Sequence, residues 1–189
     1  MPIEKMQEWL ESERQLGSRD PDRVVLATAS AVGKVRSRVV AIREMTAAGV
    51  LFFTQRTTRK ATDLAENPFA SMTLWLPLQQ REVILDGKIQ ELTSEENNFY
   101  WNTLPFERQV KFTLHQYGKQ ISSLNELENE YQVRLNEYRN KKVPIGESYC
   151  GYRLSPEIIY FYTLGVETFS EVIKYSYTGL EWKKELISP

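Results

Sequence analysis

The chain has 189 residues, which is long enough to bury a substantial core and is typical of a single domain. Lys and Arg (24) nearly balance Asp and Glu (25), so no overall charge attracts nucleic acid or an anionic membrane, and any anion site must be local. One cysteine and one histidine exclude an internal disulfide and any multi-cysteine or multi-histidine metal site.

Neither of these two residues suggests a catalytic centre of its own. Cys150 is expected to be a packing residue, because one cysteine without a placed base is weak support for a nucleophile. His115 would have to serve any Ser-His-Asp hydrolase, but no nucleophile-elbow sequence accompanies it. The N-terminus lacks an apolar signal core and no run is long enough for a membrane helix, so we expect a cytoplasmic protein.

The first half of the chain predicts one helix followed by a series of strands. Ile3, Met6 and Leu10 share one helical face, which predicts an amphipathic helix over 3–16. Apolar runs separated by Gly, Pro and polar turn residues then predict strands and one short helix. The strands are expected at 24–31, 35–44, 50–54, 69–76 and 81–92, and the helix near 58–66.

Helical signals follow, and the tail returns to strands. Thr93 with Glu96, and Ser123 with Glu126, fit capping boxes, and Pro105 can begin a helix between them. Helices are therefore expected to about Thr103, Tyr117 and Asn140, the last with a packing stripe of Leu124, Leu127, Tyr131, Leu135 and Tyr138. Further strands are expected at 152–154, 158–164, 171–177 and 180–186. This succession predicts a single α+β domain over residues 1–189, an antiparallel barrel decorated by helices.

The stretch from Arg38 to Lys60 is the candidate site. Arg38 begins a β-branched run within the expected strand 35–44, and Thr58-Arg59-Lys60 places a hydroxyl and two cations where the short helix begins. A hydroxyl residue can cap a helix, and the N–H groups and dipole of its first turn suit a phosphate. Arg38 could add a bidentate fork. The alternative is an ordinary, solvated first turn.

The order of these elements resembles the pyridoxine/pyridoxamine 5′-phosphate oxidase family of FMN-binding split barrels. The resemblance runs from about Asp20 to Pro189 and rests on several matched stretches in order. These are Val25-Leu26-Ala27-Thr28, Arg38-Val39-Val40, Phe52-Phe53-Thr54, Thr58-Arg59-Lys60, Glu66-Asn67-Pro68, Gly87-Lys88 and Gly151-Tyr152-Arg153-Leu154.

The resemblance implies a homodimer with two FMN sites at the subunit interface. It assigns the FMN phosphate to Arg38 and Thr58-Arg59-Lys60, and the flavin to Phe53, Thr54 and the backbone of Val39, Val40 and Ala41. Gln120 matches a position that reaches FMN from the partner subunit. The implied reaction is hydride-type transfer from the substrate to FMN, with dioxygen as acceptor. It needs no side-chain nucleophile, which suits a chain so poor in His and Cys.

The sequence departs from the family mostly on the substrate side. The family's C-terminal Arg-x-His-Asp-Arg run falls on Thr168-Phe169-Ser170-Glu171-Val172. Both of its substrate-contacting groups are therefore missing, and so is its last arginine, which in the family contacts FMN. Two flavin-contacting positions, a tryptophan and a glutamine, fall on Tyr162 and on Glu82, which cannot donate a hydrogen bond when ionised. Tyr100 is retained, whereas a substrate-phosphate arginine falls on Leu104 and a serine on Arg108. Arg43 stands at the position of a substrate-binding lysine, beside the flavin strand.

Several functions are consistent with these departures. Arg43 and Arg108 could rebuild the grip on a phosphorylated vitamer, or the substrate half could serve another ring compound, as in phenazine-pathway oxidases. Repurposing is favoured because a lost bidentate phosphate contact costs more than a neutral hydrogen bond. A flavin-binding or haem-binding barrel without turnover is an alternative, the haem version depending on His115. A structural dimer without cofactor is disfavoured by the intact phosphate set.

Overall fold

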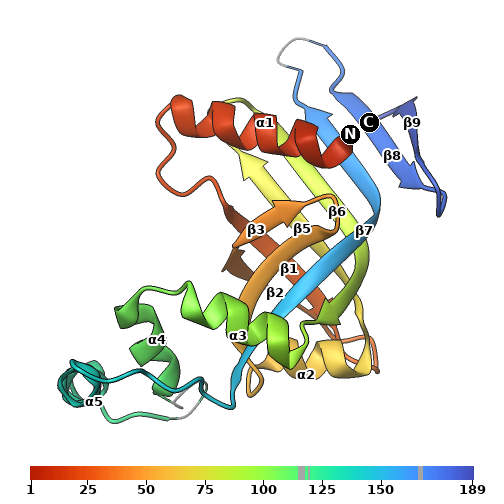
Figure 1. Cartoon of the computed structure of the whole chain (residues 1–189). Coiled ribbons are helices and arrows are strands. Elements are labelled where there is room, and N and C mark those ends of the chain that lie inside the picture. Colours follow the sequence, from red (N-terminus) through yellow and green to blue (C-terminus); the bar gives the residue numbers. More distant parts are fainter. Residues whose placement is uncertain (115–117, 119, 166–167) are drawn as a thin grey trace. The chain divides into compact units, whose positions relative to one another are not determined.

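The computed structural model describes residues 1–114, 118, 120–165 and 168–189 (Figure 1). The helices are α1 Pro2–Gln15, α2 Arg59–Glu66, α3 Ser94–Asn102, α4 Phe106–Thr113 and α5 Leu124–Tyr138. The strands are β1 Arg23–Ala29, β2 Val35–Ala41, β3 Glu44–Thr46, β4 Gly49–Gln55, β5 Phe69–Leu76, β6 Arg81–Glu91, β7 Tyr149–Thr163, β8 Glu171–Tyr177 and β9 Trp182–Ile187. His115 and Tyr117, which the sequence analysis used, lie outside the described residues.

Nine strands of the described chain form one sheet, in the order β2-β1-β5-β6-β7-β4-β3, with β8 beside β7 and β9 beside β8. The β1–β2, β1–β5, β5–β6, β7–β8 and β8–β9 pairs are antiparallel. The predicted antiparallel α+β architecture is therefore confirmed. Among the described helices, none has the length and apolar character that a membrane crossing requires.

The chain forms two compact units. The sheet unit comprises Met1–Phe52, Asp63–Gln90 and Tyr152–Pro189, and the helical unit comprises Phe53–Thr62 and Glu91–Gly151. Helix α2 contributes its first half to the helical unit and its second half to the sheet unit. That all 189 residues act as one domain remains a prediction.

In the sheet unit, α1 packs on strands through aromatic and polar contacts. The Trp9 ring meets the Phe161 ring edge-on at 5.1 Å, and Lys5 Nζ lies 5.0 and 4.8 Å from the centres of these rings. The buried carboxylate of Glu13 accepts hydrogen bonds from the Leu78 N–H and from Gln79. These contacts explain why a polar residue lies on the inner face of this helix.

In the helical unit, a core of Trp101, Val110, Val143 and Tyr149 is covered by partly buried residues of α4 and α5. The Thr93–Glu96 capping box is present, since each residue's side chain accepts the other's backbone N–H. Ser123 caps α5 by accepting from the Glu126 N–H, while the Glu126 carboxylate accepts from Ser122.

The predicted packing stripe on α5 is correct only toward the end of the helix. Tyr131, Leu135 and Tyr138 pack against the core of the helical unit. Leu124 is 78% exposed, so its assignment to the stripe was wrong. Leu124 is the first residue of α5, directly after the Ser123 cap, and it does not belong to the core cluster of the helical unit.

Two predicted boundaries also differ from the structure. The expected strand 35–44 ends at Ala41, because the Ile42 N–H bonds to Asp22 and the Arg43 N–H to Leu51, so the chain changes partner there. The expected strands 152–154 and 158–164 are one strand, β7, which continues through Pro156. At this point β6 has Gly87, where any Cβ would lie 2.2 Å from the Ser155 carbonyl oxygen.

Candidate phosphate and cofactor site

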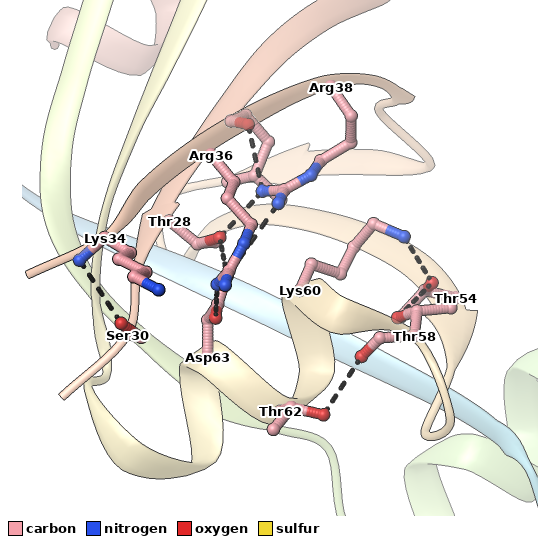
Figure 2. Close-up of polar contacts among 11 residues, drawn as sticks. Thr28, Ser30, Lys34, Arg36, Arg38, Thr54, Thr58, Lys60, Thr62 and Asp63 are labelled. Carbon is pink, nitrogen blue, oxygen red and sulfur yellow. Dashed lines mark hydrogen bonds and ion pairs between the residues drawn. The ribbon is translucent and has the colours of Figure 1, made fainter. Parts of the chain in front are cut away.

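Three polar side chains of the helical unit, those of Thr54, Thr58 and Lys60, meet at the start of α2. Lys60 is only 7% exposed, and its Nζ donates to Thr54 Oγ1 at 3.0 Å. Thr54 Oγ1 lies 3.4 Å from Thr58 Oγ1, and both threonines are buried. The Thr58 carbonyl accepts the Thr62 N–H, so Thr58 is the residue that precedes the helix (Figure 2).

This donor set suits a phosphate group. The first N–H groups of an α-helix have no acceptor within the helix, and the helix dipole is positive at that end. Thr58 adds a hydroxyl and Lys60 an ammonium that is held beside two hydroxyls. Arg59, in the same turn, is exposed. An anion with several acceptor oxygens would satisfy these donors together.

Arg38, in the sheet unit, is held by several contacts. Its Nη1 donates to the Leu26 carbonyl at 3.2 Å and to Thr28 Oγ1 at 2.8 Å, and its Nη2 lies 3.9 Å from Asp63 Oδ2. Arg36 donates to the other oxygen of Asp63 at 2.5 Å, and the Thr28 hydroxyl donates to Asp63 at 2.8 Å. Figure 2 shows Arg36 and Arg38 of β2 pointing toward Asp63 of α2.

Sequence reasoning gave no role to Thr28, Arg36 or Asp63. One signal was available, because the predicted hairpin between β1 and β2 sets their register. In the structure Leu26 lies opposite Arg38, and Thr28 opposite Arg36. The position of Asp63 had no such signal, since it depends on how a helix 35 residues from Thr28 packs.

The residues after Arg38 alternate between the two faces of β2. Val40 is buried, whereas Val39 is 60% exposed and Ala41 is exposed. Arg43 is exposed, and its backbone N–H bonds to Leu51 at 2.7 Å. Since neighbouring side chains of β2 point to opposite faces, a ligand that lies along this strand is expected to contact its backbone.

Two aromatic rings, those of Tyr100 and Tyr149, contact the Phe53 ring in the helical unit. Phe53 stacks on Tyr149, with ring centres 5.1 Å apart and planes 7° apart, and lies 5.4 Å from Tyr100. Gly151 permits this arrangement, since a Cβ there would meet the Phe53 ring at 2.5 Å. The structure thus brings two predicted site residues, Phe53 and Tyr100, into contact.

Other predicted residues lie elsewhere in their units. Arg108 and Gln120 are exposed in the helical unit. In the sheet unit, Glu82 is partly buried opposite Trp75, and Tyr162 is partly buried opposite Val172, with its ring 6.5 Å from Tyr160.

Residues 168–172, at the position of the C-terminal run in the resembled family, include no arginine or lysine. Thr168, Phe169 and Ser170 precede β8, and Phe169 is 89% exposed. Glu171 is exposed, and Val172 is buried in the sheet. A long charged side chain at position 172 would therefore have to leave the core that Val172 now fills.

Comparison with solved structures identifies the class of fold. The chain is similar to PhzG from Burkholderia lata, solved in complex with tetrahydrophenazine-1-carboxylic acid, with a TM-score of 0.91 and 24% identity over 100% of this chain and 92% of that one. It is also similar to a pyridoxamine 5′-phosphate oxidase-related, FMN binding protein from Nostoc punctiforme, with a TM-score of 0.82 and 18% identity over 98% and 96% of the two chains. The fold is the α+β, antiparallel split barrel.

Sequence comparison then gives the family. A family model described as pyridoxamine 5′-phosphate oxidase matches residues 4–133, and the chain belongs to this family. A pyridoxine/pyridoxamine 5′-phosphate oxidase from Cyanothece sp. is 28% identical over 188 residues, covering 100% of this chain and 88% of the relative. A dihydrophenazinedicarboxylate synthase from Pseudomonas chlororaphis is also 28% identical, covering 100% and 84%.

Proposed function

We propose that this chain is an FMN-dependent oxidoreductase that oxidises a small reduced ring compound, with dioxygen as the electron acceptor. The observation that carries the proposal is the first turn of α2, where buried Lys60 contacts Thr54 beside Thr58. These donors fit the phosphate of FMN, and membership of the pyridoxamine 5′-phosphate oxidase family supports the assignment. Arg38 and Arg59 are proposed to complete the phosphate contacts.

The chain's own residues are proposed to bind and orient the flavin. Phe53, held by Tyr149 and Tyr100, offers an aromatic surface, and Thr54 links this strand to Lys60. The backbone of Val39, Val40 and Ala41 is proposed to lie along the ring system, with Arg43, Glu82 and Tyr162 as further contacts. When bound, FMN supplies the two-electron oxidation of the substrate.

The substrate class follows from what the substrate side has lost. Thr168 and Ser170 stand where the family has a cation and a histidine, and Leu104 stands where it has a substrate-phosphate arginine. Missing cations weaken the hold on a substrate phosphate most strongly, because charge-assisted contacts exceed neutral ones. The relatives named for phenazine compounds support a planar, reduced ring without phosphate as the substrate.

Anaerobic reduction tests this proposal. The FMN-loaded protein is mixed with tetrahydrophenazine-1-carboxylic acid, or separately with pyridoxamine 5′-phosphate, and the flavin absorbance is followed. We expect bleaching by the reduced ring compound and little by the vitamer. Faster bleaching by the vitamer would instead support the rebuilt phosphate grip, and Arg108→Ala should then raise KM for pyridoxamine 5′-phosphate. A flavin band that neither compound changes would contradict the proposed substrate class.

We also propose that the chain forms a homodimer with FMN at its interface, to which the partner subunit's Gln120 contributes. Exposed apolar side chains on one face of β1, β2 and β5 support this proposal. Val25 lies opposite Val39 and Ala29 opposite Val35, and all three valines are exposed. Phe69 and Trp75 of β5 are also exposed, and apolar faces of this kind commonly mark interfaces.

Analytical ultracentrifugation tests the dimer. Val25→Glu should dissociate it, because a carboxylate would be buried without a partner at the interface. Val133→Glu, at an exposed position of α5 in the helical unit, is the matched control and should leave the dimer intact. A Val25→Glu protein that sediments like the unchanged dimer would show that this face is not the interface.

A further inference from the structure

We refer to four residues of the sheet unit as the Asp63 cluster: Thr28, Arg36, Arg38 and Asp63. The donor and the acceptor of each hydrogen bond among them can be assigned. The Asp63 carboxylate is 2% exposed and accepts hydrogen bonds from Thr28 and from Arg36. A hydroxyl has one hydrogen, and Thr28 gives its hydrogen to Asp63. Toward Arg38 Nη1, 2.8 Å away, Thr28 Oγ1 can therefore act only as an acceptor. Asp63 thus fixes the orientation of the hydroxyl that holds Arg38.

The two arginines have different relations to Asp63. Arg36 contacts one carboxylate oxygen at 2.5 Å, whereas the nearest Arg38 nitrogen is 3.9 Å from the other. Arg36 is therefore the closer counter-ion of Asp63. Two guanidiniums against one carboxylate leave the cluster with a net positive charge. The Arg38 side chain is 20% exposed, so an anion can reach it from solvent.

Stability alone is a weak reason for such a cluster. Taking charges out of water is costly, and apolar residues of similar size often stabilise a fold equally well. A guanidinium held on two acceptors has, in contrast, lost most of its conformational freedom before a ligand arrives. Such preorganisation increases affinity because less entropy is lost on binding. The Leu26 carbonyl and Thr28 Oγ1 fix Arg38 in this way.

We propose that Thr28 and Asp63 are positioning residues that present the Arg38 guanidinium to the flavin phosphate, and so set the preference of this chain for FMN over riboflavin. The inference rests on the proposed function, because it assigns the phosphate contact to Arg38. Arg36 completes the arrangement as the direct counter-ion of Asp63. A ligand without a phosphate gains nothing from this arrangement.

Thr28→Val tests the inference without changing any charge. The dissociation constants for FMN and for riboflavin are measured on the full chain by quenching of flavin fluorescence. Hydrogen bonds to charged groups are stronger than neutral ones, so we expect FMN binding to weaken about tenfold. Riboflavin binding should change by about twofold or less, within the usual effect of a substitution away from the ligand. Thr46→Val, at an exposed position of β3 in the same unit, is the control and should change neither constant.

Two further variants separate positioning from a structural role. Thr28→Ser keeps the hydroxyl and should restore the preference for FMN. In an Arg38→Ala background the contribution of Arg38 to the preference is already lost, so adding Thr28→Val should change the FMN constant no further. If Thr28→Val does not fold, as judged by circular dichroism, Thr28→Ala removes the same hydroxyl with the same expected result.

The outcomes distinguish the inference from the proposed function. Wild-type protein that prefers FMN, with a Thr28→Val variant whose ratio of riboflavin to FMN dissociation constants is unchanged, would overturn the inference alone. Equal weakening of both flavins by Thr28→Val would show a structural role and would also overturn it. Wild-type protein that binds neither flavin, or binds both equally, would overturn the phosphate assignment itself.

Discussion

Replacing Lys60 by methionine tests the phosphate site most simply. Lys60 is 7% exposed and its ammonium lies 3.0 Å from Thr54 Oγ1, whereas Arg59, its neighbour in the same turn, is exposed. Methionine fills a similar volume without charge. The two neighbouring cations should therefore contribute very differently to FMN binding, although both belong to the same short motif.

The burial of the Lys60 and Arg59 side chains determines how much each substitution should weaken FMN binding. A hydrogen bond to a charged group contributes about 1.5–3 kcal/mol, and each 1.4 kcal/mol is about a tenfold change in affinity. Lys60→Met should thus raise the FMN dissociation constant about 10- to 100-fold. An exposed ion pair contributes about 0–1 kcal/mol, so Arg59→Ala should raise it about fivefold or less. Arg59→Ala with Lys60→Ala should abolish FMN retention while the protein stays folded.

The assay is the titration of each apoprotein with FMN and with riboflavin, followed by flavin fluorescence. Both variants should bind riboflavin as the wild type does, because the affected group is the phosphate. Circular dichroism checks that each variant is folded. Lys60→Met that binds FMN as tightly as the wild type, or Arg59→Ala that weakens binding as much as Lys60→Met, would refute the reasoning from burial.

Three further predictions concern the scaffold. Gly151→Ala should lower the free energy of unfolding by about 1–3 kcal/mol in urea denaturation, since its Cβ would meet Phe53 at 2.5 Å. Glu13→Ala should cost about 1–3 kcal/mol in the same assay, because the part-buried Leu78 N–H and the Gln79 side chain lose the buried carboxylate that accepts from them. Burial, and then Lys184, lower the pKa of the Lys5 ammonium from 10.5. The folded chain therefore releases this proton more readily than the unfolded chain, so stability should rise with pH through the lowered pKa toward 10.5, and Lys5→Met should remove this part of the rise.

Each of the three predictions has a result that would contradict it, and Glu13→Ala also has a matched control. Glu11→Ala, on the exposed face of the same helix, should cost little, and a Glu13→Ala protein no less stable than Glu11→Ala would contradict the role of the buried carboxylate. A Gly151→Ala protein with unchanged stability would show that the Phe53 ring moves without cost. For Lys5, denaturation at neutral pH and at about pH 10 is decisive, and equal pH dependence of variant and wild type would contradict the lowered pKa.

Local pattern was sufficient to predict most elements of the fold. β5 over Phe69–Leu76 and β8 over Glu171–Tyr177 have the predicted bounds, because turn residues delimit both runs. The incorrect strand boundaries occur where a segment distant in sequence determines whether the strand ends or continues. The strand after Val35 ends at Ala41 because the next two backbone N–H groups bond to different segments, and β7 continues through Pro156 where β6 has a glycine.

The candidate site could be predicted only in outline. Thr58-Arg59-Lys60 at the start of a helix is a local signal, and the structure places α2 there. That Lys60 is buried against Thr54, and that Asp63 binds Thr28 and Arg36, depends on side-chain packing between segments far apart in sequence. Periodicity indicates which face of an element is apolar, but not which polar groups meet on it.

The central claim is that this chain holds FMN through its phosphate. The most direct measurement is the visible absorbance spectrum of the purified protein after incubation with FMN and removal of unbound flavin, alongside a sample treated with riboflavin. The account predicts a flavin band of about one equivalent per chain with FMN and a much weaker band with riboflavin. No retained flavin in either sample, or equal retention in both, would contradict it.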